Sequence, residues 1–140
     1  MPNIRLVIAS DQLAVRQALA QLLSAPLLGQ HTDDLRGRAE IVLAEVLNNI
    51  VEHAYADCAG EITLELSEEP AGIACRICDN GSAMPGLVLP EGQLAAHDPD
   101  DLPEGGFGWF LIRTLTQDLC YARQGRINEL RFRLPETETS

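Results

Sequence analysis

Residues Arg38 to Tyr55 read RAEIVLAEVLNNIVEHAY, and the spacing of their apolar side chains predicts an amphipathic α-helix. At about 100° per residue, one broad sector is apolar and holds Val42, Leu43, Val46, Leu47, Ile50, Val51 and Ala54. The narrower polar sector holds Arg38, Glu45, Asn48, Asn49, Glu52 and His53. This pattern predicts a helix that is mostly buried against a sheet and presents one polar strip.

The polar strip contains a row in which Glu45, Asn49 and His53 follow one another at helical-turn spacing. Asn is a weak helix former, because its side chain competes for nearby backbone groups. The row can be interpreted as a solvated face, or as Glu45 and Asn49 directed into a ligand site. The helix alone leaves both interpretations open.

Length and charge limit the class of protein. The chain has 140 residues, of which 46% are hydrophobic, so we expect one globular domain spanning 1–140. Its formal net charge is −11, and all ten basic residues are arginines. Nucleic-acid binding needs basic patches that neutralise phosphates, so we expect no direct nucleic-acid partner.

The chain shows no sign of a membrane or secretory segment. No apolar run approaches the roughly 20 residues of a membrane-spanning helix, and the N-terminal stretch MPNIRLVIAS does not resemble a signal peptide. We therefore expect a cytoplasmic protein that does not contact membranes. We also expect reduced, mostly buried thiols at its four cysteines, Cys58, Cys75, Cys78 and Cys120.

The remaining elements follow from periodicity and turn residues. The expected strands are Asn3 to Ala9, Glu61 to Leu66, Ile73 to Cys78, Asp118 to Arg123 and Ile127 to Leu134. The expected helices begin after Ser10 or Asp11, near Leu35 and at about Trp109. Residues 86–106 are rich in glycine, proline and acidic residues, which is typical of a functional lid, and residues 135–140 are expected to fray.

Two loop motifs carry further chemistry. Asp79-x-Gly81 leaves a predicted strand, where the carboxylate can accept a hydrogen bond from an exocyclic amine such as that of adenine. Gly105-Gly106-x-Gly108 opens a predicted helix, whose free N–H groups suit a phosphate. Each motif alone is also consistent with an ordinary turn.

The polar row of the central helix could add two further groups to a phosphate-binding site. Asn49 has an amide oxygen, which is a hard neutral ligand suited to Mg²⁺ beside phosphates. Glu45, one turn away, would lie near a terminal phosphate and could take a proton from a hydroxyl group. His53 is expected mainly to make local hydrogen bonds.

Taken in order, these motifs resemble those of the GHKL ATPase superfamily, which has the Bergerat fold. AEVLNNIVEHAY resembles its N box, CDNGSAMP its G1 box, and EGGFGWFLIRTLTQDLCY its G2 box. The resemblance covers about residues 5 to 134 and is greatest to small bacterial anti-sigma factors that act as serine protein kinases. It implies an α+β fold: a two-layer α/β sandwich with a mixed, mostly antiparallel sheet and helices on one face.

The resemblance also implies a function. It implies binding of ATP and Mg²⁺, with Glu45 as general base and Asn49 as metal ligand. The nucleotide-binding residues it implies are Asn49, His53, Asp79, Gly81, Gly105, Gly106, Phe107 and Gly108. The implied partners are a sigma factor and an anti-anti-sigma protein of the STAS type, with a homodimer that uses the N-terminal strand and first helix.

Three departures from the family pattern support alternative interpretations. Asn128 occupies the late-strand region where the superfamily often has Thr, the segment after Gly81 lacks a second Gly, and the lid is acidic. One alternative is a partner-binding module with weak or no use of nucleotide. The other is a detached histidine-kinase-like catalytic domain.

Overall fold

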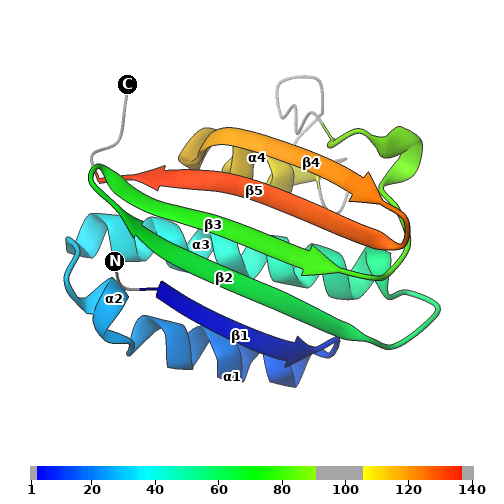
Figure 1. Cartoon of the computed structure of the whole chain (residues 1–140), viewed down its shortest axis with the longest axis horizontal. Helices are drawn as coiled ribbons and strands as arrows, with labels where there is room; N and C mark the ends of the chain where they lie inside the picture. Colours follow the sequence, from blue (N-terminus) through cyan, green and yellow to red (C-terminus); the bar gives the residue numbers. More distant parts are fainter. Residues whose placement is uncertain (1–2, 91–105, 137–140) are drawn as a thin grey trace.

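The computed structural model describes residues 3–90 and 106–136. Its strands form one five-stranded sheet in the order β1-β2-β3-β5-β4 (Figure 1). Their bounds are β1 Asn3–Ala9, β2 Glu61–Glu69, β3 Gly72–Asp79, β4 Gln117–Gln124 and β5 Ile127–Pro135. All neighbouring strands in this described part pair antiparallel, so the expectation of a mixed sheet was wrong, whereas the α+β architecture is confirmed.

The long helices lie together on one face of the sheet, with α3 behind its centre (Figure 1). The helical elements are α1 Gln12–Leu23, α2 Pro26–Gly29, α3 Asp33–Asn49, the π-helix η1 Ile50–Ala54, the 3₁₀-helix η2 Pro85–Leu87 and α4 Gly106–Leu115. None of the helices in residues 3–90 and 106–136 combines the length and apolarity needed to cross a membrane.

Helix α3 is positioned by its cap and its apolar sector. The hydroxyl of Thr32 accepts a hydrogen bond from the N–H of Leu35, which satisfies one of the free donors at the helix start. Val42, Leu43, Val46 and Leu47 are all at most 1% exposed, because this sector packs against the sheet. The predicted buried helix is therefore confirmed.

The last turn of this helix differs from the prediction. Residues 50–54 form a π-helix, so the polar row does not continue as one regular α-helical strip to Tyr55. The π turn ends where the N–H of Ser82 donates to the carbonyl of Ala54 over 2.8 Å. Wider turns of this kind are frequent at functional sites.

The inner face of the sheet consists of apolar side chains that are paired across neighbouring strands. Leu64 of β2 pairs with Ile77 of β3, which in turn pairs with Leu130 of β5. The next row of inward-facing side chains along the same strands is Leu66, Cys75 and Phe132, and each of these is at most 3% exposed. Alternation along each strand therefore directs a continuous apolar surface at the helices.

The cysteines only partly follow the prediction. Cys75 is buried and Cys78 half-buried, but Cys58 and Cys120 are exposed, so the expectation of mostly buried thiols was wrong for those two. Burial raises the pKa of the Cys75 thiol, which keeps it protonated and unreactive.

Residues 135 and 136 are more ordered than predicted. Pro135 completes β5, and the N–H of Glu136 donates to the carbonyl of Ala71 over 2.7 Å. Arg38, expected on the polar strip, is only 5% exposed, and its Nη2 donates to the carbonyl of Pro135 over 2.7 Å. Fraying at residues 135 and 136 is thus contradicted, and residues 137–140 lie outside the described part.

His31 joins the same end of the sheet. Its Nε2 lies 2.8 Å from Glu68 and its Nδ1 lies 2.6 Å from Glu136. Burial disfavours the charged ring, but the hydrogen bonds and charges of Glu68 and Glu136 outweigh that effect, so the pKa of His31 is raised.

This pairing predicts a pH-dependent stability. Because the folded chain holds the His31 proton more tightly than the unfolded chain, the added stability is fully present below the ordinary pKa of 6.5. It is lost as the pH rises through the raised folded pKa, at a slope of at most about 1.4 kcal/mol per pH unit. Urea unfolding across this range should show the loss for the wild type and not for His31→Gln. Parallel profiles for the two proteins would contradict the prediction.

Candidate functional site

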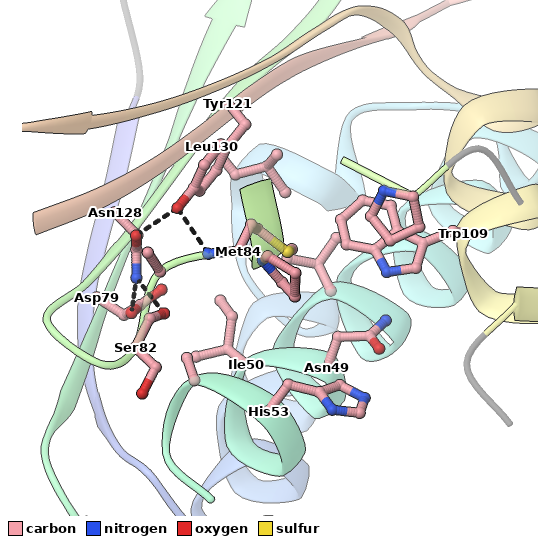
Figure 2. Close-up of a pocket in the computed structure, with 15 residues that line it drawn as sticks. Asn49, Ile50, His53, Asp79, Ser82, Met84, Trp109, Tyr121, Asn128 and Leu130 are labelled. Carbon is pink, nitrogen blue, oxygen red and sulfur yellow. Dashed lines mark hydrogen bonds between the residues drawn. The ribbon is translucent and has the colours of Figure 1, made fainter. Parts of the chain in front are cut away.

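A cavity of about 500 Å³ lies between the end of α3, the loop after β3, the start of α4 and the inner faces of β4 and β5 (Figure 2). This volume suits a ligand of nucleotide size. Its lining is mainly apolar, with a few polar side chains: Val46, Asn49, Ile50, His53, Ala54, Asp79, Ser82, Ala83, Met84, Pro85, Pro90, Trp109, Tyr121, Asn128 and Leu130.

Asp79 and Asn128 form the buried polar end of the cavity. They are register partners at the end of β3 and near the start of β5, and are 7% and 5% exposed. Oδ1 of Asp79 accepts hydrogen bonds from Nδ2 of Asn128 over 2.8 Å and from the N–H of Gly81 over 2.9 Å. Both bonds fix the rotamer of a carboxylate that lines the cavity.

A second layer of contacts holds Asn128. Its Oδ1 accepts from the hydroxyl of Tyr121 over 2.6 Å and from Nη1 of Arg123 over 2.9 Å. The same hydroxyl accepts the N–H of Met84 over 3.0 Å, and Arg123 also donates to the carbonyl of Gly81. The strand β4 therefore anchors the loop that follows β3 (Figure 2).

Gly81 allows this loop to approach the π-helix. A Cβ on Gly81 would lie 2.4 Å from the carbonyl oxygen of Ala54, so no side chain fits without a shift of backbone. Tyr55 adds a further link, because its hydroxyl accepts the N–H of Asn80 over 2.9 Å and lies 2.6 Å from the carbonyl of Glu61. Burial raises the pKa of Tyr55, so the hydroxyl stays protonated.

Asn49 faces the cavity from the last turn of α3. Its Nδ2 donates to the carbonyl of Glu45 over 2.8 Å, so the amide is oriented with Oδ1 directed away from that carbonyl. Within the described residues, no donor contacts this oxygen. An oriented amide oxygen of this kind can serve as a metal ligand.

Glu45 lies one turn before Asn49 and does not line the cavity. Its Oε2 packs against Gly108, where a Cβ would come within 2.4 Å of it, and Nδ2 of Asn49 lies near the same point. Because Gly108 has no side chain, the first turn of α4 can lie directly against Glu45 and Asn49 of α3. A helix follows the glycine motif as predicted, but α4 begins at Gly106 and not at about Trp109, so Gly106 and Gly108 lie in its first turn.

The other predicted site residues have separate positions. His53 is exposed and lines the mouth of the cavity, whereas Gly105 lies outside the described residues. Gly106 and Phe107 form the beginning of α4, and of the predicted lid only residues 86–90 and Gly106 lie in the described part.

Sequence reasoning missed Tyr121, Arg123 and Arg113. Tyr121 and Arg123 alternate with exposed residues along β4, which shows that both point inward, but it does not reveal their partners. Arg113 of α4 donates from Nε to the carbonyl of Pro90 over 2.8 Å, which fastens the loop after η2 to the helix. No local signal indicates that contact, because the two residues lie far apart in the chain.

The arrangement can distinguish the two ends of an elongated ligand. One end offers a buried carboxylate, the middle is apolar, and the other end offers the Asn49 amide beside the start of a helix. The close approaches at Gly81 and Gly108 form backbone walls that a Cβ would fill. A flat heterocycle joined to an anionic group, as in a nucleotide, matches this order of chemistry.

Comparison with known proteins agrees with that chemistry. A family model described as histidine kinase-like ATPase domain matches residues 8–134. The chain is 33% identical over 95 residues to serine-protein kinase RsbW of Bacillus mycoides and to that of Bacillus cereus strain ATCC 10987. Each alignment covers 66% of this chain and 59% of the relative, so the chain spans less than two thirds of the length of these relatives.

Among solved structures, the chain resembles the histidine kinase domain of a blue-light activated histidine kinase from Erythrobacter litoralis. The match has a TM-score of 0.48 and 23% sequence identity, and it covers 72% of this chain and 44% of that chain.

Proposed function

Since the chain belongs to the histidine kinase-like ATPase domain family, we propose that it binds Mg·ATP and phosphorylates a serine of a partner protein. The observation that carries this proposal is the presence of Asp79 and Asn49 on one cavity, with Glu45 and Gly108 packed beside Asn49. The name serine-protein kinase carried by the Bacillus relatives favours serine as the acceptor.

The cavity accounts for the proposed orientation of the nucleotide. Asp79 would accept a hydrogen bond from the 6-amino group of adenine, while apolar side chains such as Ile50, Met84 and Leu130 would cover the base. The phosphates would extend toward Asn49 and the glycines that open α4, where free N–H groups and the helix dipole favour negative charge.

The donor set at that end also suits the metal. Oδ1 of Asn49 would bind Mg²⁺, which would neutralise phosphate charge and polarise the transferring group. The chain supplies the orientation of that oxygen, through the hydrogen bond from Nδ2 to the carbonyl of Glu45.

We propose Glu45, which lies beside Asn49 and Gly108, as the general base. The serine Oγ of the partner would form a bond to the γ-phosphorus while the bond from that phosphorus to the bridging oxygen of ADP breaks. The serine hydroxyl proton would pass to the carboxylate of Glu45, and ADP would leave. Most of the rate gain in such a transfer comes from positioning and electrostatics.

The proposed partners follow from the family resemblance. One is an anti-anti-sigma protein of the STAS type, whose serine accepts the phosphate, and the other is a sigma factor that this chain would hold inactive. The proposed homodimer would use exposed side chains of β1 and α1, where Val7 is 50% exposed and Leu13 is 62% exposed.

The first test is nucleotide binding. Mg·ATP at 100 times its dissociation constant should stabilise the fold by about 2.7 kcal/mol, measured by urea unfolding. The single Trp of the chain, Trp109, lines the cavity and should report binding through its fluorescence. The absence of both responses would favour a binding module that does not use nucleotide.

The second test is transfer. The purified protein is incubated with γ-labelled ATP and candidate STAS-type proteins, and label on serine is the expected result. Label on a histidine of a partner would instead identify a histidine-kinase-like domain, and the absence of transfer to any of them with intact ATP binding would remove the kinase proposal.

A further inference from the structure

The hydrogen bonds around Asp79 carry one inference that rests on the proposed function. We infer that Asn128 is a positioning residue that makes the cavity selective for a 6-amino purine over a 6-oxo purine. It does so by occupying one oxygen of Asp79 and leaving the other as a lone acceptor toward the cavity.

The orientation of the Asn128 amide is fixed by its neighbours. Arg123 can only donate, so the group 2.9 Å from its Nη1 must be the amide oxygen. The amide nitrogen then faces Asp79, to whose Oδ1 it donates over 2.8 Å, and the carbonyl of Ser82, to which it donates over 2.9 Å. The opposite orientation would set an amide oxygen against a carboxylate.

The two oxygens of the Asp79 carboxylate consequently have different numbers of hydrogen-bond partners. Its Oδ1 accepts from both Asn128 and the N–H of Gly81, whereas no donor from the described residues reaches Oδ2. Asp79 itself lines the cavity. Asp79 therefore offers a ligand at this end of the cavity an acceptor whose orientation is fixed by two hydrogen bonds.

A fixed acceptor discriminates between purines by the group at position 6. The amine of ATP donates to it, whereas the carbonyl oxygen of inosine triphosphate (ITP) would be repelled by it. A buried polar group left unpaired by the wrong ligand is the strongest source of such discrimination. ITP is the suitable probe, because it differs from ATP only at this amino-to-oxo exchange, with the accompanying proton on N1.

Tyr121 extends the network to the loop that borders the cavity. Its hydroxyl donates to Oδ1 of Asn128 and accepts the N–H of Met84 (Figure 2). Removing the Tyr121 hydroxyl should make the Asn128 side chain less firmly held, while its amide group stays in place. Tyr121→Phe is therefore a graded version of the same change.

The test is the ratio of the dissociation constants for Mg·ITP and Mg·ATP, measured by calorimetry on the full chain. The wild type should prefer ATP by about tenfold or more. Asn128→Leu keeps nearly the same side-chain size but has no donor for Asp79, so the preference should fall below about threefold. Tyr121→Phe should give an intermediate ratio.

The matched control is Glu129→Gln. Glu129 is the next residue of β5 but points to the opposite face of the sheet, where it pairs with Arg76 and Arg131. The ratio of the two dissociation constants for the Glu129→Gln variant should equal that of the wild type. An unchanged ratio in both folded Asn128→Leu and Tyr121→Phe would overturn the inference while the proposed function stands. A wild type that binds neither nucleotide would overturn both.

Discussion

Replacement of Glu45 by Gln is expected to lower the rate of serine phosphorylation by about 10²- to 10⁴-fold, the range typical for loss of a general base. Gln has nearly the same shape, so its contact with Gly108 is retained. The carbonyl of Glu45 that orients Asn49 belongs to the main chain and is unaffected by the substitution. Nucleotide affinity should therefore remain within about threefold of the wild type, because only proton acceptance is lost.

Single-turnover transfer and calorimetric ATP binding measure the two quantities separately. Glu40→Gln is the matched control, because Glu40 is an exposed carboxylate on the same helix, and it should leave both quantities unchanged. If the Glu45→Gln protein transfers phosphate at the wild-type rate, Glu45 is not the general base and only packs against α4.

The sequence predicted the parts of the site that lie within single elements. Glu45 and Asn49 of α3 could be recognised because they lie one helical turn apart on a helix that is otherwise largely apolar. Packing against a sheet does not require two polar residues at this spacing. Asp79 and Gly108 could be found for a similar reason, since each lies at the end or start of an element where backbone groups are free.

The sequence did not predict contacts between distant segments. Asn128 could be noticed in the region where the resemblance leads one to expect a Thr, but its partners depend on the register of β5 against β3. Arg123 and Tyr121 read as ordinary alternating strand residues, and their role appears only when β4 is placed at the edge of the sheet. Such pairs have no local signature, because sequence periodicity reports which face a side chain takes and not what it meets.

The same reason explains the errors at the opposite end of the sheet. Polar residues at a chain end are normally expected to fray. Here Glu136 is held because His31 and Arg38, both far away in sequence, reach the same point. The π turn at residues 50–54 is likewise set by a tertiary contact, namely the hydrogen bond from Ser82 to Ala54.

That contact leads to the second large effect, at Gly81. Gly81→Ala would place a methyl group 2.4 Å from the carbonyl oxygen of Ala54, which is backbone and cannot rotate away. Separating the loop from the π-helix should cost roughly 1–3 kcal/mol of stability. It should also weaken ATP binding by about tenfold or more, because the N–H of Gly81 helps to fix Asp79.

Gly37→Ala provides the comparison within the same chain. Gly37 lies inside α3 with nothing within 4 Å of an added Cβ, so Ala there should stabilise the protein by about 0.5–1 kcal/mol through helix propensity. Urea unfolding should thus give changes of opposite sign for the same chemical substitution, and only Gly81→Ala should reduce the Trp109 response to Mg·ATP. If Gly81→Ala matched the wild type in both measurements, the loop would not depend on its close approach to Ala54.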